Sequence, residues 1–247
     1  MTSLIFITTL VFSFVFVFKT AEIQVSSFEI EGSNNDISEL TLDYLNDYYK
    51  KNLIFISKKK IKSNLEELSG YISVKLVEKK LPNKLIVKVE ERREVYSFKV
   101  NDKYMILDEN LKVLAQKDKN VNNINGLSNV EIKANLSDYD VNLLTKGCDF
   151  KFYDEDINRG FTLLKSYVIN RKENIKSIEV NVRSNGKINK YLLFTMTEGL
   201  TIQIDKAGED LEDKLIKMFE YYDLLENKGD TVKRYVTKLN TGEIVVV

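Results

Sequence analysis

The chain has 247 residues, enough for one or two domains with a substantial buried core. Lysine plus arginine and aspartate plus glutamate both total 37, so the formal net charge is zero and the basic residues alternate with acids. Nucleic acid is therefore not expected as a partner. The sequence has no histidine and one cysteine, Cys148, which removes the commonest metal ligand, the usual proton-transfer group near neutral pH and any intramolecular disulfide.

An apolar segment runs from Leu4 to Phe18, with no charged residue before Lys19. It is short for a spanning helix, which needs about 20 apolar residues, but it is aliphatic or aromatic almost throughout. We expect residues 1–19 to form a transmembrane anchor. A cleaved signal peptide is the alternative, although no Lys or Arg precedes the segment and no small-x-small cleavage pattern follows it.

Residues 22–92 predict a compact unit with the order strand, helix, helix, strand, strand. The first strand is expected over Ile23–Glu31, and the first helix follows an N-cap within 34–36. A second helix should begin after Ser57 and end with Gly70 in the left-handed conformation. The apolar positions of the two helices are Ile37, Leu40, Tyr44, Leu45 and Tyr48, then Ile61, Leu65 and Leu68.

The lysine run Lys58–Lys62 at the start of the second helix allows two interpretations. One is a solvated first turn, and the other is a contact with a membrane surface close to the apolar segment.

A hairpin around Pro82, the only proline, is the clearest local signal in the chain. Apolar residues alternate on both arms, so one face of each strand is expected to be buried: Ile72, Val74 and Leu76 on the first arm, Leu85, Val87 and Val89 on the second. Proline is tolerated in the turn, where the missing N–H costs least.

Residues 93–247 predict a mostly antiparallel β domain with two or more helices, so the fold class is α+β. Helices are expected after the acids at 154–156, with Ile157, Phe161, Leu164 and Val168 buried, and over about 209–225. The expected strands are 96–100, 103–107, 111–114, 178–182, 191–197, 200–204, 232–239 and 243–247.

The residues needed for common catalytic and cofactor sites are missing. There is no Gly-rich phosphate loop, no cysteine pair and no histidine base for a nucleophile. Adjacent acids such as Glu66-Glu67 and Glu90-Glu91 point to different faces of a helix or strand, and capping or solvation explains them. We therefore expect no cofactor, no metal and no enzymatic activity, and interpret the chain as a binding protein.

The strand before the C-terminal turn is the predicted binding element. Its residues are Tyr235, Val236, Thr237, Lys238 and Leu239. Terminal strands often form sheet edges, and an edge can accept a partner's strand through its main chain. The simpler alternative is that lysine and arginine in this strand protect an edge from aggregation.

The order of these parts resembles the FtsQ/DivIB family of bacterial cell-division proteins. The segment Phe28-Glu29-Ile30-Glu31-Gly32-Ser33-Asn34 is similar to the start of that family's POTRA domain. Leu81-Pro82-Asn83-Lys84, continued to Glu91-Arg92, is similar to its most specific motif, and 104–114 resembles the turn that opens its β domain. Asn110 stands where glycine is usual, and we expect it to take the left-handed conformation there.

The resemblance implies an anchor at 1–19, a POTRA domain at 22–92 and an FtsQ/DivIB-type β domain at 93–247. It also implies a single-pass membrane protein with its domains outside the cytoplasm, enriched at the division septum. Its role would be a non-catalytic scaffold that binds FtsL-like and DivIC/FtsB-like proteins by strand addition, with a septal penicillin-binding protein as a further partner. Through these partners it would help to regulate septal peptidoglycan synthesis.

Two other hypotheses remain open. A general extracytoplasmic POTRA chaperone or secretion factor would bind many extended client segments. An anchored hydrolase would need two carboxylates facing each other across a cleft.

Overall fold

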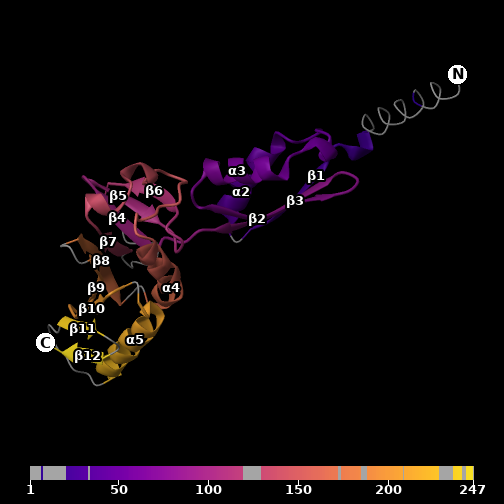
Figure 1. Ribbon diagram of the computed structural model, residues 1–247. Helices are drawn as coiled ribbons and strands as arrows, with labels where there is room; N and C mark the ends of the chain where they lie inside the picture. Colours follow the sequence, from indigo (N-terminus) through magenta and orange to yellow (C-terminus); the bar gives the residue numbers. More distant parts are fainter. Residues whose placement is uncertain are drawn as a thin grey trace. The chain divides into compact units, whose positions relative to one another are not determined.

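The structure, a computed structural model, describes residues 7, 21–32, 34–118, 129–171, 174–184, 188–207, 209–227, 236–240 and 243–246. The fold is α+β, and the chain divides into two compact units, Met1–Arg92 and Arg93–Val247 (Figure 1). Each unit has its own hydrophobic core. The anchor expected over 1–19 lies outside the described residues except for Ile7. No helix within the described ranges has the length and apolar content needed to cross a membrane.

The first unit is a three-stranded sheet packed against two helices. The sheet order is β1-β3-β2, with β1 parallel and β2 antiparallel to β3. The structure confirms the β-α-α-β-β order predicted from the sequence. The elements are η1 Ala21–Ile23, β1 Ser27–Glu31, α2 Asn35–Asn46, η2 Leu53–Phe55, α3 Lys58–Leu68, β2 Ile72–Lys80 and β3 Lys84–Glu91.

The helix starts agree with the sequence, but two other boundaries do not. The Asn34 side chain accepts the Asp36 N–H at 2.9 Å, and the Ser57 hydroxyl accepts the Lys60 N–H at 3.2 Å. Strand β1 begins at Ser27, later than predicted, because Ile23 ends the 3-10 turn η1 and Gln24 forms only an isolated bridge with Asn52. Gly70 is not among the residues with positive φ, so its predicted left-handed conformation is wrong.

The buried face of α2 also differs from the predicted stripe. Its buried residues are Ile37, Thr41 and Leu45, whereas Leu40 is exposed. Thr41 can be buried because its hydroxyl donates to the Ile37 carbonyl at 2.7 Å. Because that local bond satisfies the polar group, a threonine can occupy a core position that polarity alone assigns to solvent.

A β-bulge in β2 interrupts the alternation predicted for the hairpin. The pairing passes from Val74 opposite Val89 directly to Leu76 opposite Lys88, so no β3 residue stands opposite Lys75 in the ladder. The extra residue turns the next side chains over. Val77 is therefore buried at 8% exposure and Leu76 is exposed at 47%, so the predicted burial of Leu76 is wrong.

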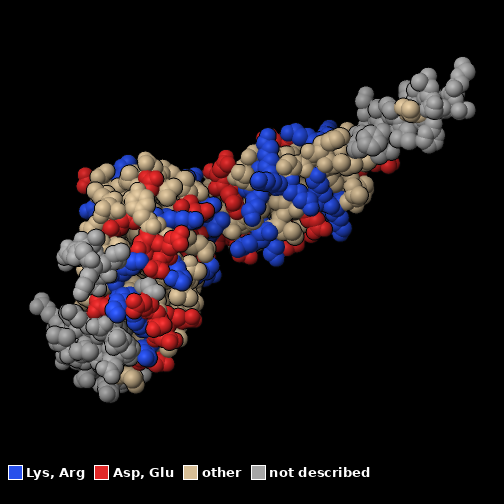
Figure 2. Space-filling model, viewed as in Figure 1, with Lys and Arg blue, Asp and Glu red and all other residues tan. Residues whose placement is uncertain are grey.

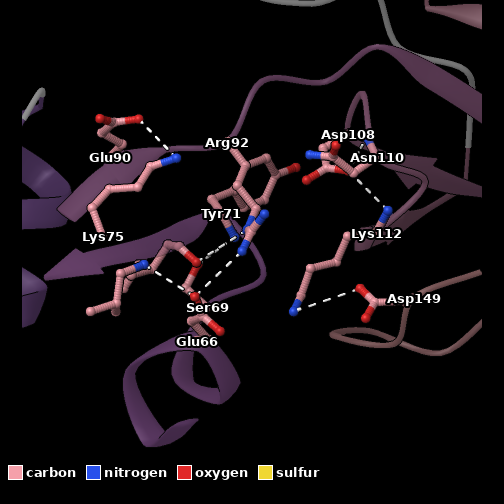
Figure 3. A network of polar contacts seen from close by, with 12 residues as sticks. Glu66, Ser69, Tyr71, Lys75, Glu90, Arg92, Asp108, Asn110, Lys112 and Asp149 are labelled. Carbon is pink, nitrogen blue, oxygen red and sulfur yellow. Dashed lines mark hydrogen bonds and ion pairs between the residues drawn. The ribbon is translucent and has the colours of Figure 1, made fainter. Parts of the chain in front are cut away.

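A side chain from α3 supports the bulge. The Glu66 Oε1 atom accepts the Val74 N–H at 3.1 Å and lies 3.4 Å from an Arg92 guanidinium nitrogen (Figure 3). Both charged side chains are largely buried, at 17% and 15% exposure. The Arg92 Nε also donates to the Ile72 carbonyl at 3.3 Å. The arginine at the end of the hairpin motif thus joins β3 to α3 and to the start of β2.

The second unit is built on a nine-stranded sheet with two helices. Strand order is β12-β11-β10-β9-β8-β7-β4-β5-β6. Five neighbouring pairs are antiparallel and three are parallel, namely β10 with β11, β7 with β8 and β4 with β7. The elements are β4 Tyr96–Val100, β5 Lys103–Leu107, β6 Val113–Lys117, β7 Val130–Lys133, η3 Leu136–Asp138, η4 Val141–Leu143, α4 Glu155–Arg171, β8 Ile175–Ser184, β9 Ile188–Met196, β10 Thr201–Asp205, α5 Leu211–Asn227, β11 Val236–Asn240 and β12 Glu243–Val246.

Strand β7 joins the two antiparallel parts of this sheet. It has four residues and pairs with β4 on one side and with β8 on the other, over three residue pairs each. The sequence does not predict this strand, because four residues carry too little periodicity to be recognised.

Helix α4 has the buried stripe predicted from the sequence. Ile157, Phe161, Leu164 and Val168 are all at most 2% exposed and belong to the core of the second unit. The Asp154 side chain accepts the N–H groups of residues 156 and 157 at 3.0 and 3.1 Å, as expected for an acid that begins a helix.

The turn before β6 differs from the prediction for Asn110. The residue with positive φ is Leu111, at 62°, and not Asn110. The buried Asp108 side chain fixes this turn by accepting the Asn110 and Lys112 N–H groups at 2.8 and 2.9 Å (Figure 3). Leu111 is 5% exposed, so core packing holds it in a backbone conformation that leucine rarely adopts.

Candidate partner-binding edge

The three C-terminal strands form one end of the nine-stranded sheet. Strand β11 runs parallel to β10, with Val236 opposite Thr201 and Leu239 opposite Ile204. Strand β12 returns antiparallel to β11, with Asn240 opposite Glu243 and Thr237 opposite Val246. Among the described strands, β12 is therefore the outermost at this end and β6 at the other.

The expectation that the predicted binding strand lies at the sheet edge is wrong. Val236, Thr237, Lys238 and Leu239 all belong to β11, which is paired on both sides. Tyr235 lies outside the described residues. The sequence identified the C-terminal strands correctly but not their order, because the parallel pairing with β10 joins segments separated by a whole helix.

Helix α5 and the end of β10 support this part of the sheet. Leu215, Met218 and Phe219 of α5 share a core with Ile202 and Ile204 of β10. The helix also anchors the turn between β9 and β10, since the Tyr222 hydroxyl donates to Glu198 at 3.0 Å. The strand on which β11 and β12 are assembled is thus fixed by packing.

A buried lysine closes the end of β10. Lys214 is 4% exposed, and its ammonium donates to the main-chain carbonyls of Asp205 and Lys206 at 3.1 and 3.2 Å. Burial lowers the pKa of Lys214, and nearby acids, Glu209 first, oppose that shift. The ammonium therefore satisfies carbonyl groups at a strand end that continues into a left-handed residue, Lys206, with φ of 50°.

The paired acids considered as catalytic candidates are bound to other protein groups. Glu66 contacts Arg92, Glu90 pairs with Lys75, and the Asn34 amide donates to Glu91. The pair Asp154 and Asp156 shares the Lys190 ammonium at 2.7 and 2.6 Å. Within the described ranges, no group of three acids or cysteines could hold a metal ion.

The contacts among Lys190, Asp154 and Asp156 shift the pKa values of Asp156 and Lys190. Hydrogen bonds from Lys190 and then Arg159 hold the pKa of Asp156 below its usual value. The same contacts, from Asp154 first and then Asp156, raise the pKa of Lys190. Each group stabilises the charged form of the other, which describes a structural link between α4 and β9 and not a proton-transfer pair.

Two comparisons with known proteins bear on these units. The family of FtsQ-type POTRA domains matches residues 23–92, which is the first unit without its N-terminal segment. The Cell division protein DivIB of Clostridium botulinum (strain Loch Maree / Type A3) is 27% identical over 194 residues, covering 77% of this chain and 69% of the relative. The first unit is an FtsQ-type POTRA domain, and the chain is similar to DivIB cell-division proteins. It is a division-related POTRA protein.

Two further DivIB proteins are similar to this chain. The protein from Clostridium tetani (strain Massachusetts / E88) is 27% identical over 69% of the chain. The protein from Clostridium botulinum (strain Hall / ATCC 3502 / NCTC 13319 / Type A) is 29% identical over 62% of it. The matched regions span 58% and 56% of these two relatives.

The sequence pattern did not identify β12 as the outer strand of the sheet in the second unit. It predicted a strand at 243–247 and assigned binding to the strand before it. The few residues between the two predicted strands indicate a hairpin. The second strand of a C-terminal hairpin lies outermost unless it inserts between strands that come earlier in the chain.

Proposed function

We propose that this FtsQ/DivIB-family protein is a non-catalytic scaffold of the bacterial division machinery, anchored in the cell membrane by residues 1–19. Its two units would lie outside the cytoplasm and be enriched at the septum. Its partners would be FtsL-like and DivIC/FtsB-like proteins and a septal penicillin-binding protein, through which it helps to regulate septal peptidoglycan synthesis. The similarity to three DivIB proteins supports this context.

The observation that carries the binding mechanism is the position of β12 at the end of the sheet. An outer strand has N–H and C=O groups directed away from its neighbour, and an extended partner segment can pair with them. We propose that a partner strand adds to β12, and that Val236–Leu239 of β11 contribute by holding β12 in place.

Alternate residues of an antiparallel strand direct their N–H groups to opposite sides. Of the neighbours Ile244 and Val245, one therefore donates toward β11 and the other away from it. Proline removes the donor. In the separate variants Ile244→Pro and Val245→Pro, one should lose partner binding while the sheet stays intact, and the other should also disturb the pairing of β11 with β12.

The measurement is the affinity of purified FtsL-like and DivIC-like partners for the full chain in detergent or nanodiscs. Ala115→Pro and Gln116→Pro, on the opposite outer strand β6, are the matched controls. Of these two, the variant that loses the N–H directed away from β5 should bind the partners with normal affinity. Normal affinity in both β12 variants would refute strand addition at this edge.

The competing proposal, a general POTRA chaperone, is separated by location in cells. A fluorescent protein fused ahead of Met1 should form a midcell ring before constriction if the chain is a division scaffold. Uniform membrane fluorescence from a functional fusion would favour the general factor.

A further inference from the structure

Three segments of the first unit meet at one end of it, which we call the hairpin pole. The pole consists of residues 24–26, residues 49–55 and the hairpin tip 79–84. Main-chain bonds join them: Val25 N–H to the Lys51 carbonyl at 2.9 Å and Ser26 N–H to the Asn83 carbonyl at 3.0 Å. The Lys79 ammonium adds a bond to the Ile54 carbonyl at 2.8 Å.

The hairpin pole exposes large apolar side chains. Phe55 is 71% exposed, Leu81 is 70% exposed and Ile54 is 42% exposed. Single exposed apolar residues are ordinary, but these come from two segments held together by the Lys79 bond. The pole therefore presents an apolar projection that its own fold does not cover.

Lysines without an ion-paired carboxylate lie on the pole, at 79 and 80, and beside it, at the start of α3. Lys84 pairs with Glu29, but no carboxylate among the described residues lies within ion-pair distance of Lys58, Lys79 or Lys80. Burial and then the neighbouring Lys58 lower the pKa of Lys79, so these two ammonium groups feel each other's charge. Figure 2 shows Lys and Arg atoms, in blue, as frequent on the visible face of the first unit.

The chain enters the pole directly from the apolar N-terminal segment. Seven peptide steps separate Phe18 from Val25, which reach at most about 25 Å when fully extended. Part of this stretch is the 3-10 turn η1, which is shorter than an extended chain. If residues 1–19 are in a bilayer, as the proposed function holds, the pole lies close to the lipid headgroups.

We propose that the hairpin pole docks on an anionic lipid surface, with Leu81 and Phe55 entering the headgroup region and Lys58, Lys79 and Lys80 facing lipid phosphates. Two observations point to this occupant, the position of the chain entry and the charge. An apolar tip beside lysines that form no ion pair with a carboxylate matches the negatively charged boundary of a membrane. This inference rests on the anchor of the proposed function and adds a second contact, which would fix the orientation of the POTRA unit on the membrane.

The test uses the full chain in nanodiscs. Cys148→Ser provides a background without thiols, and Leu81→Cys in that background carries an environment-sensitive fluorophore. We expect a blue-shifted emission, and quenching by spin-labelled lipids, in discs that contain phosphatidylglycerol. In discs of phosphatidylcholine alone, or at high salt, the shift should be lost, because the phosphate contacts are electrostatic.

Two controls locate the contact. Leu68→Cys places the fluorophore at the C-terminal end of α3, a helix of 11 residues that begins at Lys58. The emission of a fluorophore at this position should not depend on the lipid. The triple variant Lys58→Gln, Lys79→Gln and Lys80→Gln should lose the shift of the Leu81 label. The triple variant Lys62→Gln, Lys75→Gln and Lys88→Gln removes the same charge elsewhere and should keep it.

The outcomes separate this inference from the proposed function. A chain that enters the discs while its Leu81 label stays in water overturns lipid docking and leaves the anchor standing. An equal shift in both lipids overturns recognition of anionic lipid. A chain that does not enter the discs overturns the anchor and this inference together.

Discussion

Replacing Val77 by alanine should destabilise the first unit by about 2 kcal/mol. The change removes two carbons at about 0.8 kcal/mol each, and the small cavity left behind adds to this. Val77 is 8% exposed and packs in the core of the unit. Leu76→Ala removes three carbons from a side chain that is 47% exposed, so about half of the transfer term applies and the loss should be about 1 kcal/mol.

Strict alternation along β2 predicts the opposite order, because it places the larger Leu76 in the core. Lysine sharpens the contrast. Leu76→Lys should be tolerated, since a long side chain on an outer strand can reach water. Val77→Lys would bury a charge and should unfold the unit.

Hydrogen exchange of the β3 amides in the full chain is the suitable assay, because it reports opening of this unit separately from the other. A loss of 2 kcal/mol should accelerate exchange by about 30-fold. A larger effect of Leu76→Ala than of Val77→Ala would refute the bulge and the burial that follows from it.

The remaining predictions concern buried or paired acids. Glu66→Ala should destabilise the first unit more than Glu66→Gln, since the amide can still accept the Val74 N–H; exchange at Val74 measures this, and equal effects would contradict the bulge contact. Asp108→Ala should cost the second unit about 3 kcal/mol in denaturant unfolding, and an unchanged midpoint would show that other groups hold the turn. At every pH between about 5 and about 9, Asp156→Asn should melt at a lower temperature than the parent chain. The reason is that the stabilisation by the carboxylate is full above its unfolded pKa of about 3.9 and is lost as the pH falls through the lower folded pKa. Melting curves should therefore converge with the parent chain in strong acid, and a difference that persists there would point to packing.

Local patterns in the sequence were sufficient for the elements whose burial depends on their own periodicity. The stripe of α4 from Ile157 to Val168 and the N-caps at Asn34 and Ser57 are examples, since each depends on residues within one or two turns. The burial of Val77 could not be predicted this way. It depends on the bulge in β2, where the Val74 N–H donates to Glu66 of helix α3.

The candidate binding edge was only partly predictable for a related reason. The turn before residue 243 indicates the C-terminal hairpin, but which of its strands faces outward depends on the parallel pairing of β11 with β10. That pairing joins residues on either side of α5, and no local propensity encodes it.

Strand β7 has a consequence for the order in which the chain folds. Its partners β4 and β8 are about 80 residues apart in the sequence, so the large sheet cannot be completed until distant segments have been brought together. The hairpin of the first unit pairs near neighbours and precedes this sheet in the chain. We therefore expect the POTRA unit to fold early, and the second unit to remain incomplete, with unpaired strands exposed, until its last residues have left the ribosome.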